Sequence, residues 1–190
     1  MDEDNSNING QNLKGQLLLS APFLGDIFKR SVILISENNA EGSVGFVLNK
    51  ATDLKLHQII EDFPEFDAKV LIGGPVEQSS LNFIHKAGDV IEDSFKIFEG
   101  VYWGGNFEQM KILIESGSLD PVDFRFFLGY SGWSPGQLEN ELATKSWYLN
   151  KPKIQNVFSE SPENLWGKIL RTMGNEFSVI STFPDDPSLN

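Results

Sequence analysis

The sequence predicts an α+β fold in which a mixed β-sheet is flanked by helices. Short apolar runs between turn residues fill the first half of the chain, a pattern typical of buried strands. Helix signatures are concentrated in the second half, without the regular strand–helix alternation of a doubly wound parallel sheet. A length of 190 residues with 40% hydrophobic content fits one domain with a substantial core.

The chain is expected to begin with a disordered acidic leader at residues 1–12, followed by a single domain at residues 13–190. Asp, Asn, Ser and Gly dominate the leader and offer too little apolar surface to offset the entropy of ordering. Such a start is the opposite of a basic and apolar signal peptide, which predicts a cytoplasmic protein. No apolar run reaches the roughly 18 residues of a membrane helix, so no membrane association is expected.

The apolar runs define the expected strands. The first three precede any helix, and period-two alternation around residues 81–85 marks a strand with alternating faces. Strands are predicted at residues 17–19, 32–35, 44–48, 70–72, 81–85, 95–97, 101–103, 126–128 and 147–149.

Capping patterns define the expected helices. Asp53 precedes a short apolar helix, and Asn106 with Gln109 three residues later forms the next helix start. Ser161-Pro162 begins a final helix that ends near Gly174, since proline suits the first turn and glycine follows the last.

Residues 132–136 match the G-x-S-x-G pattern of a hydrolase nucleophile elbow, but the chemistry of that elbow is missing. The residue after the serine must donate its backbone N–H to an oxyanion, and Pro135 has none. The histidines, His57 and His85, both precede Ser134, against the usual order of such triads. Ser134 is therefore predicted to cap a helix, with Pro135 and Gln137 completing a capping box.

Composition argues against nucleic acid, cofactors and metals. The chain has 27 acidic and 15 basic residues, a net charge of −12, so direct binding to nucleic acid is not expected. It contains no cysteine, no Walker sequence and no dinucleotide fingerprint, and no cofactor is predicted. His57 and Glu61 have a spacing that fits two metal ligands or an ordinary exposed ion pair, and without a third ligand no metal site is predicted.

Two long motifs resemble the YqgE/AlgH family of bacterial proteins. They are Gly73-Gly74-Pro75-Val76 and the run from Gly129 to Glu141, which reads GY-x-GW-x-x-GQLE-x-E. The resemblance covers roughly residues 13–190. It implies an α+β fold with a bifurcated, barrel-like sheet, in a family that carries the label of transcriptional regulator. It brings no catalytic residue that could be transferred to this chain.

The same motifs supply the candidate binding residues, each with a structural alternative. The Gly73-Gly74-Pro75 turn could present amides to an anion or serve only as a turn. His85 could face a pocket or be a hydrogen-bonded core residue. The segment after Gly129 could form a shallow groove with an indole platform or simply cap a helix. The candidate ligand- or partner-binding residues are Gly73, Gly74, Pro75, His85, Gly132, Trp133, Gly136, Gln137 and Glu139.

The leading functional prediction is a non-enzymatic cytoplasmic domain that binds or regulates an unknown protein or small-molecule partner. The alternative is a hydrolase-like enzyme in which His85 and a nearby carboxylate, Asp26 or Glu139, activate water. A DNA-binding regulator would match the family label but conflicts with the negative charge of the chain.

Overall fold

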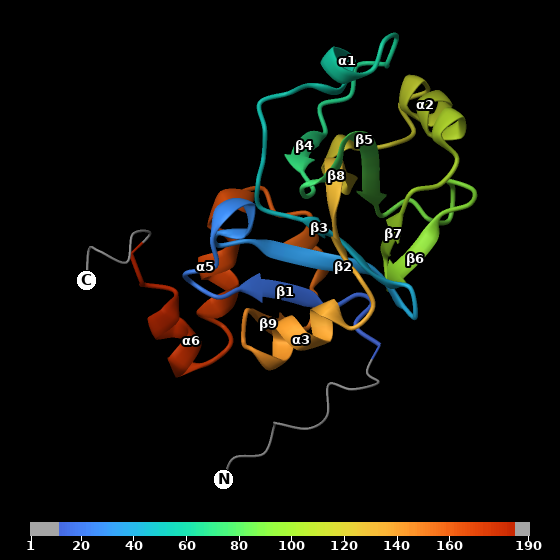
Figure 1. Cartoon of the computed structure of the whole chain (residues 1–190). Helices are drawn as coiled ribbons and strands as arrows, with labels where there is room; N and C mark the ends of the chain where they lie inside the picture. The colour runs from blue at the N-terminus through green and yellow to red at the C-terminus, as the bar shows by residue number, and fades with distance from the viewer. Residues whose placement is uncertain (1–11, 185–190) are drawn as a thin grey trace.

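The computed structural model describes residues 12–184, and most of the predicted leader lies outside them. Its strands form one sheet in the order β6-β7-β5-β8-β3-β2-β1-β9, with β4 leaving this path to pair with β8 (Figure 1). The strands are β1 (Leu17–Ser20), β2 (Val32–Asn39), β3 (Gly42–Val47), β4 (Lys69–Ile72), β5 (Val76–His85), β6 (Phe95–Phe98), β7 (Val101–Trp103), β8 (Phe124–Trp133) and β9 (Trp147–Asn150).

Helices flank this sheet, as predicted. The α-helices are α1 (Leu56–Ile59), α2 (Phe107–Glu115), α3 (Gln137–Ala143), α4 (Ile154–Val157), α5 (Leu165–Leu170) and α6 (Asn175–Ile180), and the 3-10 turns are η1 (Asp26–Phe28), η2 (Pro121–Asp123) and η3 (Pro162–Asn164). The pairing of β4 with β8 is parallel and the other pairings are antiparallel, which confirms the mixed sheet of an α+β fold. The sheet branches at β8, and its described path runs from β6 to β9 without closing into a barrel.

Strand β8 belongs to two half-sheets. Its first part, Phe124–Leu128, pairs with β4 on one side and β5 on the other, whereas Ser131–Trp133 pairs with β3. Gly129 lies between these parts with a φ of +67°, a left-handed conformation that glycine adopts without strain. Figure 1 shows β8 running from the half-sheet of β4 to β7 into the half-sheet of β1, β2, β3 and β9.

The Gly73-Gly74 segment crosses β8 at this branch point. The amide of Gly73 donates to the carbonyl of Leu128 at 2.9 Å, and its carbonyl accepts from the amide of Val47 on β3, also at 2.9 Å. A Cβ on Gly74 would overlap the carbonyl group of Tyr130 and the nitrogen of Ser131. Only glycine allows main chain to approach main chain this closely, so the Gly-Gly pair is required by the crossing.

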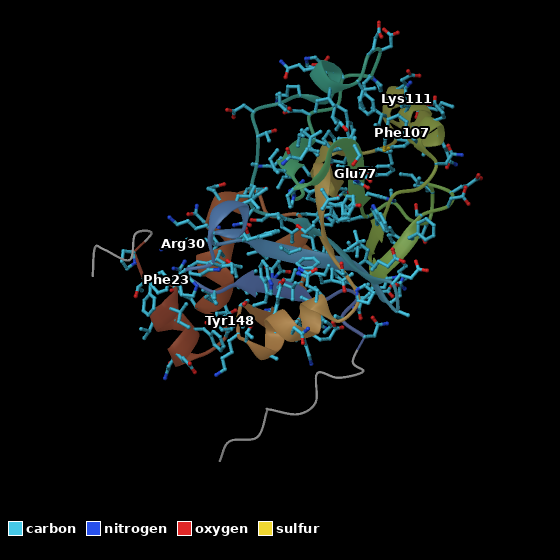
Figure 2. The ribbon with its side chains drawn as sticks, viewed as in Figure 1. Phe23, Arg30, Glu77, Phe107, Lys111 and Tyr148 are labelled. Atoms are coloured by element: carbon cyan, nitrogen blue, oxygen red, sulfur yellow. The ribbon has the colours of Figure 1, made fainter. Side chains whose placement is uncertain are left out.

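Three apolar clusters fill the space around the two half-sheets. Aromatic rings dominate the cluster beneath α2, where Phe124 and Phe126 lie with Phe63, Phe66 and Phe83. Near the C-terminal end, the indole N–H of Trp166 on α5 donates to the carbonyl of Ser20 at 3.0 Å. Figure 2 shows Phe23, Arg30 and Tyr148 on the side of the β1–β3 half-sheet where α5 and α6 pack.

The strands agree with the predicted ones, but two helix starts differ, and α4 and α6 were not predicted. Helix α3 begins at Gln137, and its N-cap is Gly136, which has a φ of +76°. The prediction that the side chain of Ser134 caps this helix is therefore wrong. Helix α1 is capped at Lys55 and not at Asp53. The predicted final helix begins as η3 at Pro162 and continues as α5 to Leu170, whereas α6, which follows Gly174, was not predicted.

We expect Gly74→Ala to destabilise the fold by about 3 kcal/mol or more, because the new Cβ would separate the two crossing main chains. Urea unfolding followed by tryptophan fluorescence measures this change. Gly25→Ala is the matched control, since its Cβ would meet no atom within 4 Å. Equal stability of the two variants would contradict the tight crossing.

Candidate functional site

The two family motifs meet at one open groove of about 430 Å³. Val76, directly after the Gly-Gly-Pro turn, pairs with Tyr130 of the second motif. The hairpin between β2 and β3 supplies the facing wall, since Ser43 pairs with Trp133. The groove is lined by Glu37, Asn39, Glu41, Gly42, Ser43, Val44, Val76, Tyr130, Gly132, Trp133, Ser134 and Pro135.

Two glycines shape this groove in different ways. Gly42 has a φ of +127°, and a Cβ there would overlap the carbonyl oxygen of Trp133, so glycine is needed for the hairpin to close on β8. Gly132 is exposed, and a Cβ there would lie 3.4 Å from the ring of Tyr130 and 3.8 Å from Val76. These are ordinary contact distances. A Cβ at Gly132 would therefore fit beside Tyr130 and Val76 without disturbing the backbone.

A second hollow of about 330 Å³ adjoins the first and shares Val44 and Tyr130 with it. Its polar lining includes Asn82, whose side-chain oxygen accepts from the indole N–H of Trp103 at 3.4 Å. The lining is Val44, Phe46, Glu77, Ser80, Leu81, Asn82, Trp103 and Tyr130. We call the two hollows together the Tyr130 groove.

Trp133 reaches the groove, but its indole belongs to the core. The residue is 6% exposed, and its ring packs edge-on against Trp147 with centroids 6.1 Å apart. Both indole N–H groups donate to the same carboxylate oxygen of Glu141, at 2.9 Å from Trp133 and 2.7 Å from Trp147. The indole is therefore held inward rather than presented as an open platform for a ligand.

Glu141 is a positioning residue that our sequence analysis missed. Its second oxygen accepts from the side-chain amide of Gln137 at 2.9 Å, and Gln137 in turn accepts from the amide of Ser134 at 3.0 Å. The available signal was the spacing of Gln137 and Glu141, which places both on one face of α3. These bonds tie α3 to β8 and β9.

The remaining predicted residues of this motif lie beside the groove and not in its lining. Gly136 is the exposed N-cap of α3. Glu139 lies in the first turn of α3, where a carboxylate interacts favourably with the helix dipole. Gln137 is occupied by its bonds to Ser134 and Glu141. Of the predicted site residues after Gly129, the structure places Gly132 and Trp133 in the lining.

The Gly73-Gly74-Pro75 turn shapes the backbone beside the groove and presents no exposed amide N–H groups to a ligand. Gly73 donates its N–H to Leu128, and its carbonyl also accepts from the hydroxyl of Ser131 at 3.1 Å. Gly73 and Gly74 are buried, and Pro75 has no amide hydrogen to offer. The turn places Val76 in the groove wall.

His85 lies in a separate aromatic environment and is fully buried. Its Nδ1 accepts from the amide of Ala87 at 3.1 Å, so Nε2 carries the proton and donates to the carbonyl of Gly104 at 2.8 Å. Its ring stacks on Phe124 with an interplanar angle of 12° and on Tyr102 from the neighbouring strand. Burial lowers the pKa of His85, although the bond to Gly104 acts in the opposite direction.

This geometry gives no support to water activation by His85 with a carboxylate. Its hydrogen-bond partners are two backbone groups and the hydroxyl of Ser94. Glu139 is on α3, which packs against β3 and β9 in the other half-sheet. Asp26 begins η1, whose Phe28 packs against Trp147 in that same half-sheet.

Neither a metal-binding cluster nor a membrane-spanning helix is found within residues 12–184. His57 lies exposed on α1, with Glu61 just beyond the helix, and no group of three or more histidine or acidic residues within residues 12–184 could hold a metal ion. No helix in the described part of the chain is both long and apolar enough to span a bilayer.

Comparison with known proteins identifies the class to which this branched α+β fold belongs. The sequence profile of the AlgH-like family matches residues 17–178. A UPF0301 protein from Cytophaga hutchinsonii is 44% identical over 179 residues, which cover 93% of this chain and 98% of that protein. A UPF0301 protein from Chlorobium phaeobacteroides is 40% identical over 177 residues, covering 93% of this chain and 95% of the relative.

Solved structures show the same fold. A crystal structure of a protein from Corynebacterium diphtheriae aligns with a TM-score of 0.76 at 24% identity, covering 91% of this chain and 93% of that one. The solution structure of the AlgH protein from Pseudomonas aeruginosa aligns with a TM-score of 0.70 at 23% identity, covering 94% and 98%. The chain belongs to the AlgH-like family, which confirms the resemblance carried by its two motifs.

We expect Glu141→Ala to destabilise the protein by roughly 3 kcal/mol, because it leaves the indole N–H groups of Trp133 and Trp147 without their acceptor. Glu139→Ala on the same helix removes a carboxylate without breaking these bonds and should cost less than about 1 kcal/mol. Denaturant unfolding compares the two. A loss of similar size in both variants would contradict the role of Glu141.

Protonation of His85 should destabilise the fold. Because its folded pKa lies below that of the unfolded chain, its contribution is complete above a pH of about 6.5 and is lost as pH falls below it. We expect a loss of about 1 kcal/mol between pH 7.5 and 5.5 in chemical unfolding. His57→Gln should keep this pH dependence and His85→Gln should weaken it. An unchanged pH slope in His85→Gln would contradict the assignment.

Proposed function

We propose that this protein is a non-enzymatic binding domain and that the Tyr130 groove is the surface that holds its partner. The observation that carries the proposal is the convergence of both family motifs on this groove. Val76 is the last residue of the first motif, and Tyr130, Gly132 and Trp133 belong to the second, although more than 50 residues separate the two. A concave surface on which a few polar groups converge is typical of a binding site.

The side chains in the groove support binding rather than bond cleavage. The lining offers carboxylates, amides, hydroxyls and aromatic rings, and it includes no histidine. Ser134 lies in the lining, but Pro135 supplies no amide for an oxyanion. The hydrogen bonds of His85 are satisfied in the core, away from both hollows.

The proposal extends to a regulatory role in the cytoplasm, exerted through a protein or small-molecule partner. The net charge of −12 and the carboxylates in the groove favour a partner other than nucleic acid. The absence of cysteine suits a reducing compartment, because the fold needs no disulfide.

Gly132→Val tests the proposal by filling the groove. The new side chain should fit beside Tyr130 and Val76 and leave the unfolding midpoint nearly unchanged. Gly25→Val is the control, because it adds the same side chain where no atom lies within 4 Å. Each tagged protein is used to capture partners from a lysate of the source organism, with quantitative mass spectrometry as the readout.

We expect partners captured by the parent protein and by Gly25→Val to be reduced at least tenfold with Gly132→Val. Identical capture by all three folded proteins would show that the groove does not hold the partner, and the proposal would fail.

A further inference from the structure

We propose that the occupant of the Tyr130 groove is an extended peptide segment of a partner protein that carries lysine or arginine side chains. This inference rests on the proposed function, since it names the chemistry of the partner for the same surface. Three properties of the groove lead to it: the sign of its charge, its aromatic side chains and the presence of carboxylates at both of its adjoining hollows.

The charge of the groove has one sign. Glu37 and Glu41 line the first hollow and Glu77 lines the second, and neither lining contains lysine or arginine. None of the three carboxylates forms an ion pair with another residue in the part of the chain that the structure describes. A cationic segment would provide the missing counter-charges, and like charge would repel an anionic one.

The negative charge of the Tyr130 groove does not simply follow from the acidic composition of the chain, because another hollow on the surface is lined by positive side chains. A hollow of about 300 Å³ between α4 and α5 is lined by Lys153 and Lys168 together with amides and hydroxyls, and its lining contains no carboxylate. The side chains that line these two hollows therefore carry opposite charges, and those of the Tyr130 groove are negative.

Aromatic side chains make the groove suitable for cationic groups. Tyr130 is half-buried between the two hollows, and Trp103 lines the second. Phe95 extends this aromatic surface, because its ring lies 6.2 Å from that of Trp103 and the residue is 66% exposed. Ammonium and guanidinium groups interact favourably with the faces of such rings, and the aliphatic stems of lysine and arginine pack against them.

The arrangement of the carboxylates favours an extended segment over a single small cation. Glu37 and Glu41 come from the β2–β3 hairpin, whereas Glu77 comes from β5 at the other hollow. Val76 pairs with Tyr130 and Leu81 pairs with Leu128, so five residue steps along β5 lie opposite two residue steps along β8. The extra residues of β5 form a bulge, and Glu77 lies in this bulge outside the regular pairing. Carboxylates at both hollows can each receive a cationic side chain from one peptide.

The probe is a fluorescein-labelled peptide of alternating arginine and alanine, compared with peptides that carry glutamine or glutamate in place of arginine. Fluorescence anisotropy at low salt should show binding of the arginine peptide at least tenfold tighter than the glutamine peptide. Binding should weaken as salt increases, because the contacts are charged and solvent-exposed.

A charge-matched pair of variants locates the site. Glu41→Gln with Glu77→Gln should weaken binding of the arginine peptide at least fivefold, and Gly132→Val should weaken it as well. Glu61→Gln with Glu115→Gln removes the same charge from exposed positions outside the groove and should leave affinity within twofold of the parent. Equal losses in the two double variants would show non-specific attraction and overturn the inference.

The outcomes separate this inference from the proposed function. If Gly132→Val abolishes capture of the natural partner while the arginine peptide shows no preference over the glutamine peptide, the groove is a binding surface but its occupant is not basic. If the arginine peptide binds Gly132→Val as tightly as the parent, the basic segment binds elsewhere and the inference fails.

Discussion

The fold depends on one close crossing of main chain over main chain. Gly73 and Gly74 pass β8 so closely that a Cβ on either residue would overlap its backbone, and the hydrogen bonds of Gly73 join β3 to β8 at the crossing. Gly129 supplies the positive φ with which β8 passes from one half-sheet to the other. The crossing therefore adds a second connection to the one that β8 makes between the half-sheets, and the largest apolar cluster packs against both of them.

The same crossing produces the groove. Val76 emerges from it beside Tyr130, and the last residues of β8 continue to the β2–β3 hairpin, which closes against Trp133 at Gly42. Glu141 holds this end of β8 in place through the indoles of Trp133 and Trp147. The buried part of the family motif thus fixes the backbone, whereas the half-buried Tyr130 and the exposed Gly132 border the space in which a partner could lie.

Much of the fold could be predicted from local patterns, because strand and cap signals depend on near neighbours. The apolar runs gave the strands, and Asn106 caps α2 by accepting from the amide of Gln109 as expected. The site was harder to predict. Whether the indole of Trp133 or the ring of His85 faces solvent depends on segments far away in the chain, and Glu37 and Glu41 join the groove only through the pairing of β3 with β8.

Native-state hydrogen exchange at the crossing tests this account most directly. The amides of Val47 and Gly73, which donate to Gly73 and Leu128, should exchange only through global unfolding, with the same free energy as the core amides of both half-sheets. Exchange of these two amides through a low-energy local opening, or distinct free energies for the two half-sheets, would show that the crossing does not unite the fold and would contradict the account.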